Sequence, residues 1–240
     1  SSPSAAPSPS SQAPAGQGPY KVAATVPVEG GAYHLAVDPG THTVYVAGSG
    51  NAVSVIDGAK RTITATVPIE GGAGDLAVDP GTHTVYATNV DNTVSVIDGA
   101  TRTVTATVPV AEGPVHLAVD PGTHTVYVAT GRMCGNRGYC TGDGAVSVID
   151  GATRTVAATV QVGSETHDLA VDPTTHTLYV STRDGVSVVD GATRAVTGTV
   201  PVGNFPGKLA VDPDTHTAYV ISQDGLSVID GATRTVTATV

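Results

Sequence analysis

The chain has 240 residues, with 21 acidic and 11 basic side chains and a net charge of -10 at neutral pH. So acidic a chain offers no electrostatic basis for holding nucleic-acid phosphates, and we expect no nucleic-acid partner. The sequence also contains no transmembrane segment and no phosphate-binding, zinc-protease or dinucleotide-binding motif.

Residues 1–19 differ from the rest of the chain in composition. They are rich in Ser, Pro and Ala and cannot bury a core, so we expect a disordered tether there and a single repeat domain over residues 20–240. No initiating Met and no apolar signal region precede this tail. We therefore expect either the mature form of an exported protein or a trimmed segment.

After the tail, a sequence repeat of about forty residues occurs five times. Each copy contains an Asp-Pro pair, and these pairs begin at Asp38, Asp79, Asp120, Asp172 and Asp212. Each copy holds four short runs of Val, Ile, Tyr, Thr and Ala, separated by turn residues, and none has helical periodicity. The pattern predicts an all-β protein in which each copy is one four-stranded antiparallel blade of a β-propeller.

In the first copy the expected strands are residues 35–37, 43–47, 52–56 and 62–67, which we letter a to d from the axis outward. Gly58 follows Asp57 between strands c and d, and we expect it to supply the positive φ angle of a tight hairpin.

The repeat words resemble those of the bacterial YVTN-type (YncE-like, surface-layer) β-propellers. The resemblance rests on Tyr86-Ala87-Thr88-Asn89, on Leu-Ala-Val-Asp-Pro and on Val-Ser-Val-Ile-Asp-Gly-Ala-Thr, and it covers residues 20–240. It implies an exported propeller, commonly of seven blades, with varied ligands. The residue that is commonly Asn before strand b is His here, which leaves the fold expectation unchanged and puts a shared ligand in doubt.

The two ends of the repeat region do not match a closed ring. Residues 21–26 read as a strand d with no strands a to c before them, whereas the last copy already has its own strand d. We expect five complete repeats and one orphan N-terminal strand, belonging to a six- or seven-bladed ring. A closed five-bladed ring is the alternative.

Because strands alternate in direction, the loops divide between two faces. The a–b and c–d loops recur almost unchanged and form the monotonous face, whereas the d–a and b–c loops differ between copies and form the variable face. Binding is expected on the variable face, whose candidate contact residues are Arg132, Arg137, Tyr139, Arg183 and Phe205.

The long b–c loop of the third copy contains the only two cysteines, Cys134 and Cys140. Two cysteines in one short Gly-rich loop predict a disulfide and an oxidising compartment. The loop is either a recognition element or a stapled surface loop.

One variable-face position lies just before each Leu-Ala-Val. We expect its side chains, with His167 beside them, to ring one mouth of the central channel: His34, Asp75, His116, Asp168 and Lys208. Two imidazoles and two carboxylates, from His34, His116, Asp75 and Asp168, are a candidate set for a divalent metal. The alternative is a set of structural or solvated polar groups, because propeller mouths are usually polar.

The segments Thr-His-Thr and Thr-Arg each occur at an equivalent position in the repeats. We interpret His42, His83, His124, His176 and His216 as makers of local hydrogen bonds. Arg61 and its equivalents are expected to pair with neighbouring carboxylates such as Asp57.

Two functions follow from this reading. The first is a non-catalytic exported scaffold, secreted, periplasmic or tethered at the cell surface, that binds a protein or an envelope component. The second is a metal-assisted enzyme of the lactonase or lyase kind at the channel mouth, with His167 as acid or base.

Overall fold

The computed structural model describes residues 21–130, 133–134, 140–141 and 143–240, and only the backbone at 133, 134, 140 and 141. The expected tether at residues 1–19 lies outside the described residues.

In this part of the chain the long strands form five four-stranded antiparallel sheets, each ordered a to d. Blade 1 comprises β1 (His34–Asp38), β2 (Thr43–Ala47), β3 (Ala52–Asp57) and β4 (Thr62–Pro68). Blade 2 comprises β5 (Ala73–Asp79), β6 (Thr84–Asn89), β7 (Thr93–Asp98) and β8 (Thr103–Pro109). Blade 3 comprises β9 (His116–Asp120), β10 (Thr125–Thr130), β13 (Asp143–Asp150) and β14 (Thr155–Ser164). Blade 4 comprises β15 (Thr166–Asp172), β16 (Thr177–Thr182), β17 (Gly185–Asp190) and β18 (Ala195–Val200). Blade 5 comprises β19 (Leu209–Asp212), β20 (Thr217–Ser222), β21 (Gly225–Asp230) and β22 (Thr235–Thr239).

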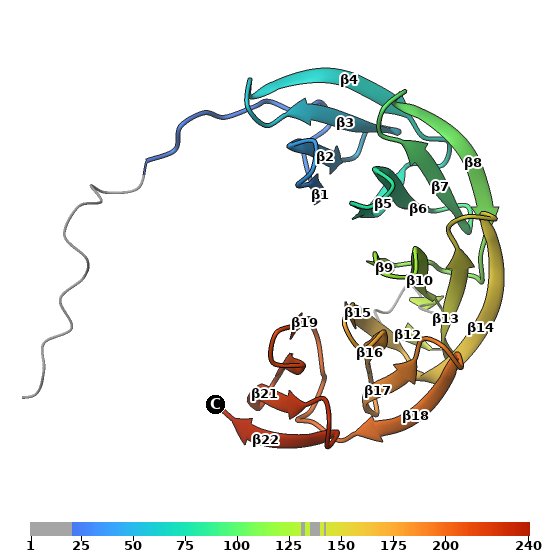
Figure 1. Cartoon of the computed structure of the whole chain (residues 1–240), viewed down its shortest axis with the longest axis vertical. Coiled ribbons are helices and arrows are strands. Elements are labelled where there is room, and N and C mark those ends of the chain that lie inside the picture. The colour runs from blue at the N-terminus through green and yellow to red at the C-terminus, as the bar shows by residue number, and fades with distance from the viewer. Residues whose placement is uncertain (1–20, 131–132, 135–139, 142) are drawn as a thin grey trace, which may run out of the picture.

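The blades are arranged radially, with strand a innermost and strand d on the outer wall (Figure 1). Strand a of each blade contacts strand a of the next, through β1, β5, β9, β15 and β19. The β-propeller prediction is therefore confirmed. The closed five-bladed alternative is wrong, because the arc is open between blades 1 and 5 (Figure 1). Leu35 in β1 and Ile221 in β20 are accordingly exposed.

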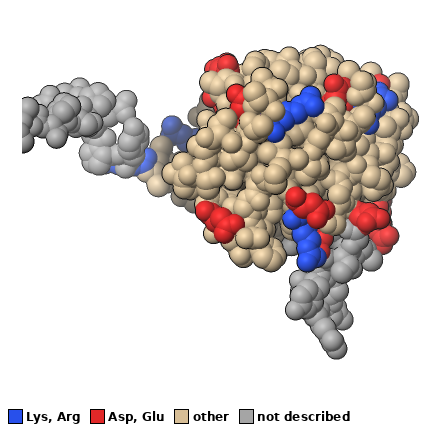
Figure 2. Space-filling model, turned by 90° about the horizontal axis from the view of Figure 1, so that it is seen from below, with Lys and Arg blue, Asp and Glu red and all other residues tan. Residues whose placement is uncertain are grey.

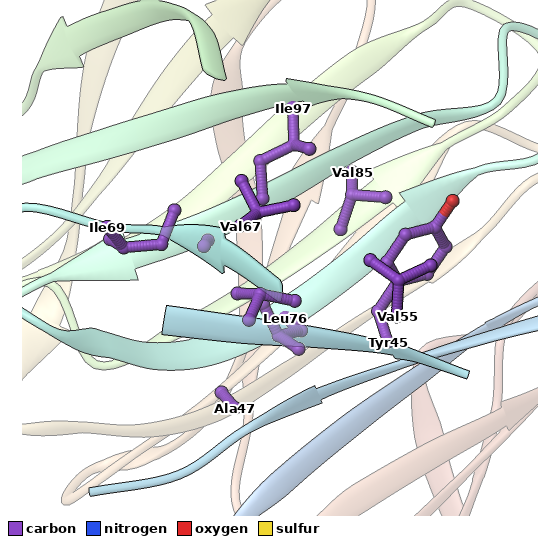
Figure 3. Packing of buried hydrophobic residues seen from close by; sticks show 10 residues of the cluster. Tyr45, Ala47, Val55, Val67, Ile69, Leu76, Val85 and Ile97 are labelled. Atoms are coloured by element: carbon purple, nitrogen blue, oxygen red, sulfur yellow. The ribbon is translucent and has the colours of Figure 1, made fainter. Parts of the chain in front are cut away.

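The hydrophobic core lies between neighbouring blades rather than within any one of them. Four clusters of buried residues fill the four blade interfaces, and Figure 3 shows the first, in which Tyr45 and Val55 of blade 1 approach Val85 and Ile97 of blade 2. Val-rich strands supply this packing because their branched side chains suit a pleated surface that is buried on both faces.

In blades 2 to 5 the strand-b tyrosine of the preceding blade explains the glycine that follows strand c. Tyr127 is fully buried, and a Cβ placed on Gly191 of the next blade would lie 2.6 Å from its hydroxyl oxygen. The expectation for Gly58 was wrong, since the left-handed residue of that turn is Arg61, at φ 58°. Gly58 is needed instead for close approach, because an added Cβ would lie 2.7 Å from the His42 carbonyl oxygen.

The repeated histidines join blades. His83 Nδ1 lies 2.7 Å from Oδ2 of Asp38, a buried residue of blade 1, and the same contact recurs at the other three interfaces. For these four histidines the interpretation as makers of local hydrogen bonds was therefore wrong, because each bonds an aspartate of the preceding blade. The arginines also differ from expectation, because Asp57 pairs with Lys60, whereas Arg102 donates to the carbonyl oxygen of Thr64 in the preceding blade.

The orphan strand expected at residues 21–26 is not formed. Residues 21–26 have no strand assignment and are mostly exposed. The physical reason is that a strand d receives its hydrogen bonds from a strand c, and no strand c lies beside this segment. The described residues contain no helix with the length and hydrophobicity of a membrane span.

Candidate functional site

The inner strands bring three of the predicted channel-mouth residues together. His34 begins β1, Asp75 lies in β5 and His116 begins β9, so neighbouring blades each contribute one of them. Asp75 lies between the two imidazoles, with Oδ1 3.0 Å from His34 Nδ1 and Oδ2 3.2 Å from His116 Nδ1. The imidazole centroids are 6.3 Å apart. We call these three residues the His-Asp-His cluster.

The Asp75 carboxylate also accepts a hydrogen bond of 3.1 Å from the backbone N–H of Leu117. Burial by itself raises the pKa of Asp75. The hydrogen bonds from His116 and Leu117 and the nearby imidazoles lower it more, so its pKa lies below the ordinary value. Asp75 is therefore a carboxylate that accepts from four donors, the two imidazoles and the backbone N–H groups of Leu76 and Leu117, and each imidazole directs Nδ1 toward it. Nε2 is the nitrogen that each ring has left for a ligand.

The other predicted mouth residues form a second, separate pair. Asp168 Oδ1 lies 3.3 Å from Lys208 Nζ, and Asp168 Oδ2 accepts from the backbone N–H of Leu209 at 3.0 Å. His167 is half-buried and directly precedes Asp168 in β15. The two aspartates thus act alike, because each binds the N–H of the Leu that begins the Leu-Ala-Val word in the next blade. Both have a structural use in addition to any binding use.

The four candidate metal ligands do not form one group. Among the described residues, no three His, Cys, Asp or Glu side chains converge so as to hold a metal ion together, and this includes the His-Asp-His cluster, whose members are bonded to one another. His34, Asp75 and His116 are together, whereas Asp168 is engaged with Lys208.

Of the predicted variable-face residues, Arg183 and Phe205 can be placed. Arg183 Nη1 pairs with Glu165 Oε1 at 3.3 Å. Phe205 is 67% exposed and has φ 51°, a left-handed conformation that is rare for a bulky residue. Arg132, Arg137 and Tyr139 lie outside the described residues. The backbone pairs Cys134 directly with Cys140 across β11 (Met133–Cys134) and β12 (Cys140–Thr141), but their side chains are not described, so the disulfide stays a prediction.

Sequence reasoning missed two exposed apolar side chains on this face. Tyr33 is 71% exposed just before His34, and Val90 is 80% exposed in the loop between β6 and β7. The available signal was an apolar residue inside a variable-face loop, where the neighbouring residues are polar. Single exposed apolar residues are common on protein surfaces, so these two mark positions to test and do not by themselves define a contact surface.

Radial four-stranded blades around a polar opening define the class of this protein as a β-propeller. Among solved structures it is similar to "Kuenenia stuttgartiensis Hydrazine Synthase", a propeller-containing protein, with a TM-score of 0.68. The two share 18% identity over 88% of this chain and 69% of that chain, a likeness that shows the fold alone. The sequence matches no protein-family model and no curated protein, so the YVTN-type resemblance stays a prediction.

Proposed function

We propose that the protein is a non-catalytic exported scaffold that binds a protein or cell-envelope component through its variable face. The observation that carries the proposal is a difference between the two faces, since one has recurring side chains that join blades and the other has side chains that vary from blade to blade. On the monotonous face the recurring Asp and His side chains hold adjacent blades together. On the variable face each blade presents different side chains from the same backbone positions, which is how repeat scaffolds obtain specificity.

The variable face carries exposed apolar side chains and charged side chains that a partner could contact. Tyr33, Val90 and Phe205 are exposed there. Seen edge-on, charged side chains gather along the two rims, with a mostly uncharged wall between them (Figure 2). The two basic side chains described on the variable face, Arg183 and Lys208, are already paired with acids. The excess acids favour a partner that carries positive charge.

Export is supported by the composition of two segments. The Ser, Pro and Ala tail suits a flexible spacer that holds a domain away from an envelope. The two cysteines suit an oxidising compartment, since they lie opposite each other on adjacent backbone segments. Fractionation of the source cells tests this part, and recovery of the protein only with reduced cysteines in the cytoplasm would contradict it.

The binding proposal is tested by capture from envelope extracts on immobilised protein. We expect a defined component that wild-type protein retains and that a Tyr33→Ser plus Phe205→Ser variant loses. A Lys60→Ser variant on the monotonous face is the control and should retain it. Equal capture by all three proteins, or no capture by any, would overturn the proposal.

The second candidate function is a metal-assisted enzyme, and the His-Asp-His cluster is the observation that favours it. A carboxylate that orients an imidazole through Nδ1 leaves Nε2 to bind a metal or to move a proton. Elemental analysis of protein purified without chelator separates the two functions. A stoichiometric metal that is lost in His34→Ala plus His116→Ala supports the enzyme, and its absence from the wild-type protein removes the metal-assisted form.

A further inference from the structure

A cavity of about 280 Å³ opens on the variable face where blade 1 passes into blade 2. Its walls come from the end of β4, from the loop between β6 and β7, and from β8, which are neighbours in Figure 1. The lining residues that matter here are Pro68, Glu70, Asn89, Asp91 and Val104. The lining combines carboxylates, an amide and apolar groups.

Asn89 is the unusual member of this lining. It is 2% exposed, and its Oδ1 has no hydrogen-bond partner, the single such buried side-chain atom among the described residues. Its Nδ2 donates to Thr93 Oγ1 at 2.8 Å and to Ser95 Oγ at 2.9 Å. The Thr93 hydroxyl donates its proton to Asp91 Oδ1, at 2.6 Å. Toward Asn89 this hydroxyl can therefore act only as an acceptor. The amide orientation is therefore fixed, and an unused acceptor, buried beneath the surface, belongs to a residue of the cavity lining.

An unused buried acceptor costs free energy, and comparison between copies shows that the fold does not require one here. At the same position blades 3, 4 and 5 have Thr130, Thr182 and Ser222. Each of these hydroxyls donates to the carbonyl oxygen of a strand-c residue, so its hydrogen bond is satisfied. Only blade 2 places an amide at this position.

Two carboxylates accompany the amide. Asp91 packs against the backbone beside Glu70, since a Cβ added to Gly71 would lie 3.3 Å from Asp91 Cγ. In the described part of the chain, neither Glu70 nor Asp91 has a Lys, Arg or His within salt-bridge distance. Their negative charge is therefore not neutralised within the fold.

We propose that this cavity binds a primary ammonium or guanidinium group carried on an aliphatic chain. The cationic group donates to the two carboxylates, and its entry displaces the atoms that cover Asn89 Oδ1, so that this oxygen accepts one of its N–H groups as well. The aliphatic chain lies along Pro68 and Val104, as the stems of lysine and arginine do on apolar surfaces. This inference deepens the proposed function, on which it rests for a partner, by giving that partner's anchor a chemistry.

Blade 1 contains a matched cavity that serves as an internal control. It occupies the equivalent place, measures about 410 Å³ and is lined by Glu29, but Gly48 and Gly50 stand where blade 2 has Asn89 and Asp91. It therefore offers one carboxylate and no amide acceptor. We expect ammonium binding at blade 2 and not at blade 1.

The test is an NMR titration of backbone amides with n-butylammonium chloride, because a small probe does not depend on partner capture. We expect saturable shifts at residues 70, 89 and 91. Affinity should fall about tenfold or more in Asn89→Thr and in Asp91→Asn, since each removes a charge-assisted hydrogen bond, and should not change in Glu29→Gln. Trimethylbutylammonium, which has no N–H donor, should also bind about tenfold more weakly.

Three outcomes would overturn the proposal. They are chemical shifts that do not saturate, equal affinities for n-butylammonium and trimethylbutylammonium, and a loss of affinity in Glu29→Gln as large as that in Asn89→Thr. Thermal unfolding of each variant verifies that it remains folded. N-acetyl-lysine amide and spermidine then distinguish a protein side chain from a free polyamine as the source of the cation. If n-butylammonium binds but envelope extracts yield no partner, the scaffold proposal fails, whereas the assignment of this cavity as a cation-binding site still holds.

Discussion

His83 Nδ1 lies 2.7 Å from Oδ2 of Asp38, a residue 45 positions earlier in the chain, and so joins the second blade to the first. The carboxylate is fully buried, and its other oxygen accepts the backbone N–H of Gly40 at 2.9 Å. The Asp-Pro and Thr-His-Thr segments therefore recur together for a physical reason, because in blades 1 to 4 each aspartate closes its own turn and also binds the histidine of the following blade.

Removing one of these histidines should destabilise the fold. We expect His124→Ala to lower the free energy of unfolding by about 1–3 kcal/mol, because it leaves the buried carboxylate of Asp79 without its imidazole. Urea denaturation followed by circular dichroism measures the change. His42→Ala is the matched control, because His42 occupies the same turn in blade 1 and has no aspartate from a preceding blade. Equal losses in the two variants would contradict the assigned role.

Acid should weaken the same interfaces. Burial alone raises the pKa of Asp172, but hydrogen bonds from Thr174 and His216 outweigh it and lower the pKa from 3.8 to about 2. Because the folded-state value is the lower one, Asp172 stabilises the fold above pH 3.8, and this contribution disappears as the pH falls from 3.8 to about 2.

We expect Asp172→Asn to be less stable than wild type at pH 5 and to lose less of its remaining stability between pH 5 and pH 2.5. Urea denaturation at the two pH values measures the difference. Parallel losses in the variant and the wild type would show that other carboxylates control the acid transition.

Much of the fold follows from the sequence, because strand pattern and repeat length are local properties. The expected strands of the first copy agree with β1 to β4 within one residue at each end. The contacts between blades were not predictable in this way. His83 and Asp38, or Tyr127 and Gly191, meet only when two copies are placed side by side, and no spacing within one copy encodes that geometry.

A glycine prediction follows from the tyrosine contacts. Gly191→Ala should destabilise the protein by about 1–3 kcal/mol, because the added Cβ would lie 2.5 Å from the His176 carbonyl oxygen and 2.6 Å from the Tyr127 hydroxyl oxygen. Gly198→Ala in β18 is the control, since nothing lies within 4 Å of its added Cβ. Thermal unfolding compares them, and a stable Gly191→Ala would refute the close-packing explanation.

The candidate site was predictable in part. The shared position before Leu-Ala-Val indicated where His34, Asp75 and His116 lie, because one position in equivalent strands falls at one height on the axis. Their contacts with one another could not be predicted, because these depend on how neighbouring blades are rotated relative to each other. The unpaired oxygen of Asn89 was beyond sequence reasoning, since it depends on where Thr93 sends its hydroxyl proton.

The cysteine pair gives a redox prediction. Cys134 and Cys140 are directly opposed across an antiparallel ladder, where α-carbons lie about 4.5–5.5 Å apart and a disulfide fits. We expect the protein from an oxidising compartment to resist alkylation until it is reduced, and mass spectrometry measures the two added groups. Cys134→Ser should then leave one thiol that reacts without reduction. Alkylation of both cysteines in the untreated protein would contradict the prediction.

Asp75 provides the most direct test of the channel mouth. Its carboxylate receives both His34 Nδ1 and His116 Nδ1, so neutral imidazoles should be held as Nδ1–H tautomers. In Asp75→Asn the amide presents only one acceptor oxygen, and we expect at least one imidazole to lose this preference. Nitrogen chemical shifts of the histidine rings measure the tautomers at pH 8. Asp168→Asn is the control, because it removes the equivalent carboxylate of blade 4 and contacts Lys208 instead of His34 or His116. If Asp75→Asn leaves both ring spectra unchanged, Asp75 does not orient the imidazoles, and the cluster loses the feature that suits it to bind a metal or move a proton.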